Sequence, residues 1–169
     1  LAVRADHPSN IKNLPWVCGG CSDERGFSEG SQPMGIFRPV HLIITNEVRI
    51  EPFGVHVWND IQGKQASLFI NTTLKNYSGS TKTVQLFHQL TNKVGLLLAS
   101  CSTQQRLLTG KEILVEQSIK NLLPALWSFE NPYLYNVTTI IIENGRVVDK
   151  LVTDFGFRTI KFDRDNSNR

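Results

Sequence analysis

Several features that mark other protein classes are missing or rare in this sequence of 169 residues. No apolar run approaches the roughly 20 residues of a membrane-spanning helix, so we expect no membrane span. The 18 Lys and Arg residues are spread along the chain and give a net charge of only +3, without the basic face that nucleic-acid binding needs. Amphipathic helical patterns are nearly absent. These absences favour a globular all-β protein that binds no nucleic acid.

Cysteine is scarce, because Cys18, Cys21 and Cys101 are too few and too unevenly placed for a disulfide-rich scaffold. Cys18 and Cys21 have the spacing of a redox pair, but such a pair follows a strand and opens a helix. Here Pro15 precedes the pair and no helix start follows it. A zinc site would need a second pair. We interpret the two thiols as loop residues and keep a small redox enzyme only as a third hypothesis.

The first residues, Leu1 to Pro8, contain neither an initiator Met nor the basic, apolar and small-residue regions of a signal peptide. We therefore expect a segment of a longer protein, and the sequence assigns it to no cellular compartment. Residues 1–34 are rich in Gly, Ser, Pro and Asn, a composition that predicts irregular chain.

Apolar residues recur with a period of two from Ile36 onward, which is typical of half-buried strands. Turn signals such as Tyr77–Ser80 and Asn144–Gly145 separate these runs, and Asn-Gly suits a type I′ hairpin. The polar stretch Ser102–Gln105 is expected to interrupt the strands, and Leu122–Trp127 is the one stretch that could form a helical turn. The alternation predicts strands over Val40–Ile44, Val48–Val57, Leu68–Leu74, Val84–Leu90, Val94–Ala99, Ile113–Ile119, Tyr135–Ile141, Val147–Leu151 and Phe155–Phe162.

About seven strands after residue 50, at the spacing of a sandwich, define the predicted fold class. It is an all-β, immunoglobulin-like antiparallel β-sandwich, preceded by an irregular segment with one or two strands.

Two motifs carry a family resemblance. Residues Gly35–Leu42 read Gly-Ile-Phe-Arg-Pro-Val-His-Leu, which resembles the last part of the jelly-roll sugar-binding domain of family 2 glycoside hydrolases. The second motif runs through Leu126–Ser128, Asn131–Tyr135 and Asp154–Ile160, and it is similar to the end of the immunoglobulin-like domain of that family. The order of the motifs matches the passage from the sugar-binding domain through the sandwich to a catalytic (β/α)₈ barrel.

The resemblance implies a division of the chain into three parts. Residues 1–50 are expected to be the C-terminal remnant of a jelly-roll sugar-binding domain, and residues 51–163 to form the immunoglobulin-like β-sandwich domain. Residues 164–169 are expected to be a disordered tail or a linker to the catalytic barrel.

The motif residues are interpreted as packing devices rather than as catalytic groups. Trp127 is expected to fill the space between the sheets, and Pro132 to keep the residue before it extended. Gly156 permits a close backbone approach, and Arg158 can pair with a carboxylate or with backbone carbonyls. The predicted structural residues are Gly35, Arg38, Trp127, Pro132, Tyr135, Gly156 and Arg158.

No catalytic residue, metal ligand or cofactor is predicted. A retaining glycosidase needs two carboxylates about 5 to 5.5 Å apart, and the resemblance places both in the barrel. His88 falls on an apolar strand face and is expected to be a hydrogen-bonded core histidine. The remaining groups are interpreted as surface charge or as histidines without metal-ligand spacing, and they are Glu112, Glu116, Glu130, Glu143, Asp149, His7, His41 and His56.

The resemblance also implies one substrate-binding candidate. In β-galactosidases and β-glucuronidases an acidic residue six positions before the Gly of the first motif belongs to a loop that reaches the active site. Counting back from Gly35 gives Glu29, which would accept hydrogen bonds from sugar hydroxyl groups in the intact parent enzyme only.

The resemblance implies a non-catalytic structural domain of a β-glycosidase of the β-galactosidase type. Its partners would be the sugar-binding domain and the catalytic barrel of the parent enzyme, which it would orient, and it could support homo-oligomer contacts. The alternative is an independent carbohydrate- or protein-binding β-sandwich module. Such a module would show clustered exposed aromatic residues, whereas Trp16, Trp58 and Trp127 are scattered along the sequence.

Overall fold

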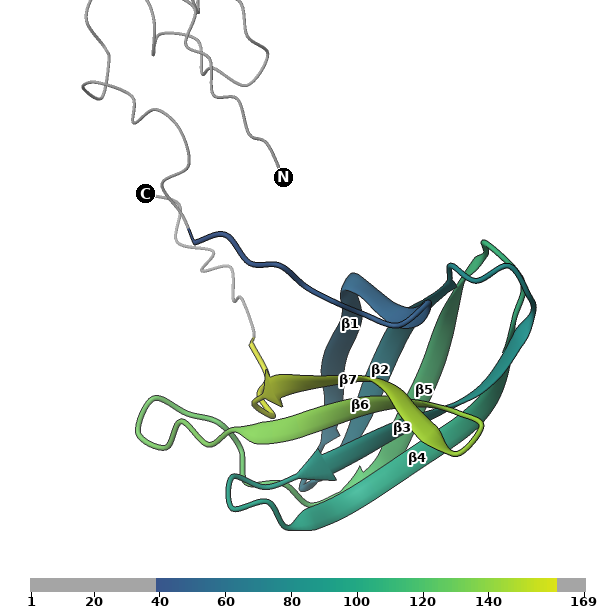
Figure 1. Cartoon of the computed structure of the whole chain (residues 1–169). Coiled ribbons are helices and arrows are strands. Elements are labelled where there is room, and N and C mark those ends of the chain that lie inside the picture. The colour runs from purple at the N-terminus through teal and green to yellow at the C-terminus, as the bar shows by residue number, and fades with distance from the viewer. Residues whose placement is uncertain (1–38, 161–169) are drawn as a thin grey trace, which may run out of the picture. The chain divides into compact units, whose positions relative to one another are not determined.

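A computed structural model describes residues 39–160, and these residues contain seven strands and no helix (Figure 1). It follows that no helix in this range is long and apolar enough to cross a membrane. The strands are β1 Val48–Gln62, β2 Gln65–Asn76, β3 Lys82–Thr91, β4 Leu97–Leu107, β5 Glu112–Leu122, β6 Tyr135–Glu143 and β7 Arg146–Phe155.

The strands form two sheets, one with the order β1-β2-β5 and one with the order β4-β3-β6-β7. Every pairing is antiparallel, and Figure 1 shows the two sheets as the layers of a sandwich. The prediction of an immunoglobulin-like antiparallel sandwich is confirmed. The Asn144-Gly145 turn between β6 and β7 has φ angles of 50° and 76°, as a type I′ hairpin requires.

Contacts between Cα atoms divide the chain into the units Leu1–Ile43 and Ile44–Arg169. The predicted strand at Val40–Ile44 is wrong, because the described residues from 39 to 46 are irregular and exposed. An extended segment becomes a strand only when a neighbouring strand takes up its backbone hydrogen bonds. The sandwich begins by Val48, since the side chains of Val48 and Ile50 are buried in it.

Three local predictions need correction. The polar stretch Ser102–Gln105 does not interrupt the strands but belongs to β4, where it pairs with β3. Backbone hydrogen bonds form this pairing, so polar side chains on an edge strand do not prevent it. Residues 123–127 form no helical turn, and Pro124 within them favours extended chain before it. Strand β7 ends at Phe155. The strand predicted for Phe155–Phe162 is therefore wrong for residues 156–160, which are irregular. Phe157 is nevertheless fully buried.

The core between the sheets consists of two apolar clusters. One holds Val48, Ile50, Leu74, Val84, Leu86, Leu107, Val115 and Ile141. The other holds Ala66, Leu68, Ile70, Leu90, Ile119, Tyr135, Val137 and Phe157.

A polar layer separates the two clusters. Thr72, His88 and Thr139 are fully buried, and each lies two residues from a member of either cluster on its own strand. His88 Nε2 lies 2.9 Å from Thr72 Oγ1 and pairs in register with Thr139. Burial lowers the pKa of His88 to about 4, so the ring is neutral at pH 7. The prediction of a hydrogen-bonded core histidine is confirmed.

Strand β1 contains a bulge at Glu51-Pro52-Phe53-Gly54. Ile50 pairs with Leu74 and Val55 with Thr72, so four residues of β1 lie opposite Thr73 alone. Phe53 has a positive φ of 58° and is fully exposed. A Cβ atom at Gly54 would lie 2.6 Å from the Glu51 carbonyl oxygen, so the bulge requires glycine there.

Candidate functional site

The second family motif closes one end of the sandwich, where β5 and β7 end and β4 and β6 begin (Figure 1). We call residues 92–98, 123–134 and 156–160 the loop end. Tyr135, at the start of β6, is buried, and its hydroxyl oxygen accepts a hydrogen bond of 2.7 Å from the Ala125 amide. The Trp127 amide donates a bond of 2.8 Å to the Phe157 carbonyl. These bonds tie the separate parts of the motif together.

Trp127 is half-buried and lies against Gly156, not between the sheets as predicted. A Cβ atom at position 156 would come within 3.2 Å of the indole, which explains why a glycine stands there. The Arg158 guanidinium lies 5.5 Å from the centre of the Trp127 ring, within the range of a cation–π contact. Its backbone amide and carbonyl both bond the Asn59 side chain. Pro132 is exposed.

A hollow of about 330 Å³ lies beside Trp127, and its other lining residues are Val57, Leu134, Asp154, Phe155, Gly156 and Arg158. The Phe129 ring lies 5.2 Å from that of Trp127, and Phe129 keeps 89% of its surface accessible. The exposed apolar residues of the loop end are Val94, Leu96, Leu97, Leu98, Leu123, Leu126, Phe129, Leu134 and Ile160. Apolar patches of this kind mark interaction surfaces.

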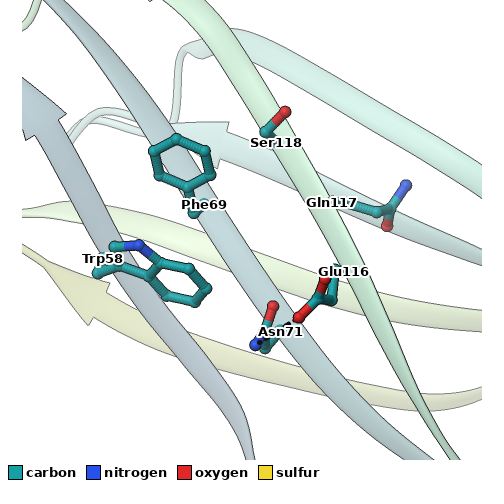
Figure 2. Close-up of a pocket in the computed structure, with 6 residues that line it drawn as sticks. All are labelled: Trp58, Phe69, Asn71, Glu116, Gln117 and Ser118. Atoms are coloured by element: carbon teal, nitrogen blue, oxygen red, sulfur yellow. Dashed lines mark hydrogen bonds between the residues drawn. The ribbon is translucent and has the colours of Figure 1, made fainter.

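A groove of about 200 Å³ lies on the outer face of the three-stranded sheet (Figure 2). Two rows of paired residues cross the sheet there. Trp58, Phe69 and Ser118 form one row, and His56, Asn71 and Glu116 form the next. Gln117 completes the lining. Sequence reasoning missed this cluster because its members come from three separated segments. Phe69, Asn71, Glu116 and Ser118 occupy outward positions of strands it predicted. Trp58 follows the predicted end of its strand, and Gln117 lies on the inward-facing row of β5.

The acidic residues considered in the sequence lie apart and have structural partners or solvent around them. Glu143 forms an ion pair of 3.0 Å with Lys82, and Asp149 accepts a bond of 2.7 Å from the Ile50 amide. Glu112 and Glu116 point outward, and Glu130 lies in an exposed loop. Residues 39–160 include no group of three His, Cys, Asp or Glu side chains that could hold a metal ion. Glu29, Gly35 and Arg38 lie outside the described residues.

Comparison with known proteins identifies the family. A model of the glycosyl hydrolases family 2 matches residues 48–158. The chain belongs to this family. Its members include a β-galactosidase, BoGH2A, from Bacteroides ovatus, which is 30% identical over 164 residues. A β-glucuronidase from Formosa agariphila is 25% identical over 129 residues. The resemblance identified in the two motifs is confirmed at the level of the family.

The chain spans only a small part of these relatives. It is matched over 96% of its own length to 18% of the Bacteroides ovatus protein, and over 76% to 13% of the Formosa protein. A solved structure of a family 2 member from Bacteroides cellulosilyticus superposes with a TM-score of 0.66 at 27% identity, over 70% of this chain and 16% of that one. The sandwich therefore corresponds to one domain of these larger proteins.

Proposed function

We propose that this chain works as a non-catalytic domain of a larger β-glycosidase of the β-galactosidase type, and that it holds other domains of that enzyme in place. The exposed apolar surface of the loop end carries the proposal. Nine large apolar side chains are exposed on its three segments, and apolar residues exposed in such number normally pack against another protein surface.

The proposed partner of the loop end is another domain of the same enzyme. The relatives are several times longer than the segment that matches this chain, so they supply further domains for such contacts. Inter-domain surfaces within one polypeptide resemble moderate protein–protein interfaces with an apolar centre. The Trp127 hollow and Phe129, which projects from the surface beside it, offer both a recess and a protruding side chain for this packing.

A non-catalytic role is supported by the positions of the carboxylates. Hydrolysis with retention requires two of them facing one sugar about 5 to 5.5 Å apart. Here Glu143 and Asp149 are engaged by Lys82 and by the backbone of β1, while Glu116 bonds Asn71. We expect the isolated chain to give no turnover of p-nitrophenyl β-galactoside or β-glucuronide. Turnover that one Asp or Glu substitution abolishes would overturn the proposal.

A chimera tests the docking role directly. Residues 48–158 replace the matching segment of the Bacteroides ovatus β-galactosidase, and hydrolysis of p-nitrophenyl β-galactoside is measured. Phe129→Ser and Leu134→Ser are expected to lower the midpoint of thermal inactivation of the chimera, because they remove apolar packing between domains. Val147→Ser, at a residue of β7 that is 60% exposed at the opposite end, is the matched control. Equal effects of all three changes would contradict the docking role.

A further inference from the structure

The groove of Figure 2 contains a flat aromatic surface. The rings of Trp58 and Phe69 lie with their centres 5.6 Å apart and their planes at 16°, and Figure 2 shows them side by side on the outer face of the sheet. The His56 ring lies with its centre 5.2 Å from that of Trp58 and is tilted by 35° to it. Trp58 keeps 37% of its surface exposed. Removing an exposed aromatic surface from water is favourable, so such a surface on a sheet suits a ligand with an apolar face.

Hydrogen-bond acceptors border this aromatic surface on one side. Asn71 and Glu116 are paired in register on β2 and β5, and Ser118 lies one row further along β5. The Asn71 amide nitrogen donates a bond of 3.4 Å to Glu116 Oε1. Glu116 and Ser118 are exposed and carry oxygen atoms that can accept hydrogen bonds. The edge of the groove therefore matches a ligand that brings hydroxyl donors.

We propose that this groove binds one ring of a neutral sugar. A pyranose combines an apolar C–H face, which would stack on Trp58 and Phe69, with a rim of hydroxyl groups, which would donate to Glu116 and Ser118. The volume of about 200 Å³ is below the range of drug-sized sites, so it suits a single ring. Glu116 is the one ionised side chain of the lining, and its negative charge disfavours uronic acids.

The site is separate from the surface used in the proposed function. Trp58 and Val57 are neighbours in β1 and point to opposite faces of the strand, and Val57 lines the Trp127 hollow while Trp58 lines the groove. A negative result for sugar binding thus leaves the docking role of the loop end unaffected. A positive result would give this domain a second task, retention of sugar chains.

The test is a titration of the full 169-residue chain with methyl β-D-galactoside. Binding is monitored through the chemical shifts of amide and indole N–H groups in nuclear magnetic resonance spectra. We expect saturable shifts at Trp58, Asn71 and Ser118, with a Kd of about one millimolar because the contact area is small. Trp58→Ala should abolish them. Phe129→Ala removes an aromatic side chain that is 89% exposed at the loop end, and it should leave the Kd unchanged.

Glu116→Ala keeps the aromatic surface and changes only an exposed side chain, so we expect this variant to fold. It therefore tests the site even if Trp58→Ala does not fold. It should weaken binding by about tenfold, the lower end of the loss expected for one hydrogen bond to a charged acceptor. Three outcomes would overturn the proposal: no saturable shifts, shifts that persist in both variants, or binding of methyl β-D-glucuronide or butylammonium at least as tight as binding of the galactoside.

Discussion

The two ends of the sandwich are built differently. At the hairpin end, short turns connect β2 to β3, β4 to β5 and β6 to β7, and the buried Asn76 side chain bonds backbone groups of the first turn and of the end of β4. At the loop end, a long connection over residues 123–134 joins β5 to β6. Nine large apolar side chains are exposed on residues 92–98, 123–134 and 156–160. The hydrogen bonds of the hairpin end centre on buried side chains, whereas the loop end leaves large apolar side chains exposed, the surface that we propose docks on another domain.

Asn76 is the centre of the hairpin end. Its side-chain nitrogen donates to the carbonyls of Ser80 and Leu107 at 2.8 and 3.1 Å. Its side-chain oxygen accepts from the Ser78 amide and hydroxyl at 2.9 and 2.6 Å. Asn76 is fully buried. One side chain thus joins the turn after β2 to the end of β4.

The largest effect is expected from Asn76→Ala. It removes these bonds and leaves buried partners without them, which should lower the free energy of unfolding by about 3 kcal/mol. Urea denaturation followed by circular dichroism measures the loss. Asn92 at the loop end is the matched control. Its side-chain oxygen accepts bonds from the amides of Val94 and Leu96 in a turn, but this side chain is more accessible than that of Asn76. If Asn92→Ala costs as much as Asn76→Ala, the contrast between the ends is wrong.

Acid should weaken the polar layer between the two core clusters. The pKa of His88 is about 4 in the folded protein, below its ordinary value of 6.5. As the pH falls from 6.5 towards 4, the unfolded chain takes up a proton that the folded chain does not, so stability decreases over that window. The full difference corresponds to about 3 kcal/mol, and about 2 kcal/mol should be lost by pH 5.

The variant His88→Gln isolates this contribution from the titration of carboxylates. Urea denaturation at pH 7 and pH 5 should show a smaller stability loss in the variant than in the unchanged chain. An identical pH dependence in both proteins would mean that His88 is not the group responsible.

A moderate effect is expected from Gly156→Ala at the loop end. The new Cβ would meet the Trp127 side chain at 3.2 Å, and we expect a cost of about 1–2 kcal/mol from the displaced ring. A shift of tryptophan fluorescence should accompany it. Gly79→Ala at the hairpin end is the control, since nothing lies within 4 Å of an added Cβ there. A destabilisation of the Gly79 variant equal to that of the Gly156 variant would refute the proposed clash.

The smallest effect is expected from Phe129→Ser in the isolated chain. Because the side chain is 89% exposed, the free energy of unfolding should change by less than about 0.5 kcal/mol. Differential scanning calorimetry measures it. A loss above about 1 kcal/mol would place Phe129 within the fold rather than at a docking surface.

Much of the sandwich was predictable because its strands alternate strictly. In β2, each residue from Ala66 to Asn76 that points inward is buried and its neighbour is not, so periodicity alone defines the strand. The extent of β4 was not predictable from this pattern, since its inward positions include Thr103 and Gln105. Edge strands depend on backbone pairing with a neighbour, and sequence periodicity does not record that pairing.

The candidate site was less predictable than the fold. Family motifs indicated Trp127, Gly156 and Arg158, and these three residues do lie together. The groove around Trp58 escaped prediction because Phe69 and Glu116 come to it from other strands. Which outward residues share a row depends on strand order and register, and the bulge in β1 shifts that register by three residues.

The bulge in β1 has a consequence for how copies of this domain behave in a crowded solution. Strand β1 is an edge of its sheet, and an unbroken edge of this length would be a template for strand addition and fibril growth. The bulge at Glu51-Pro52-Phe53-Gly54 interrupts the outer row of amides and carbonyls, and Pro52 has no N–H to offer. The same irregularity that displaces Phe53 outward therefore guards this edge against aggregation.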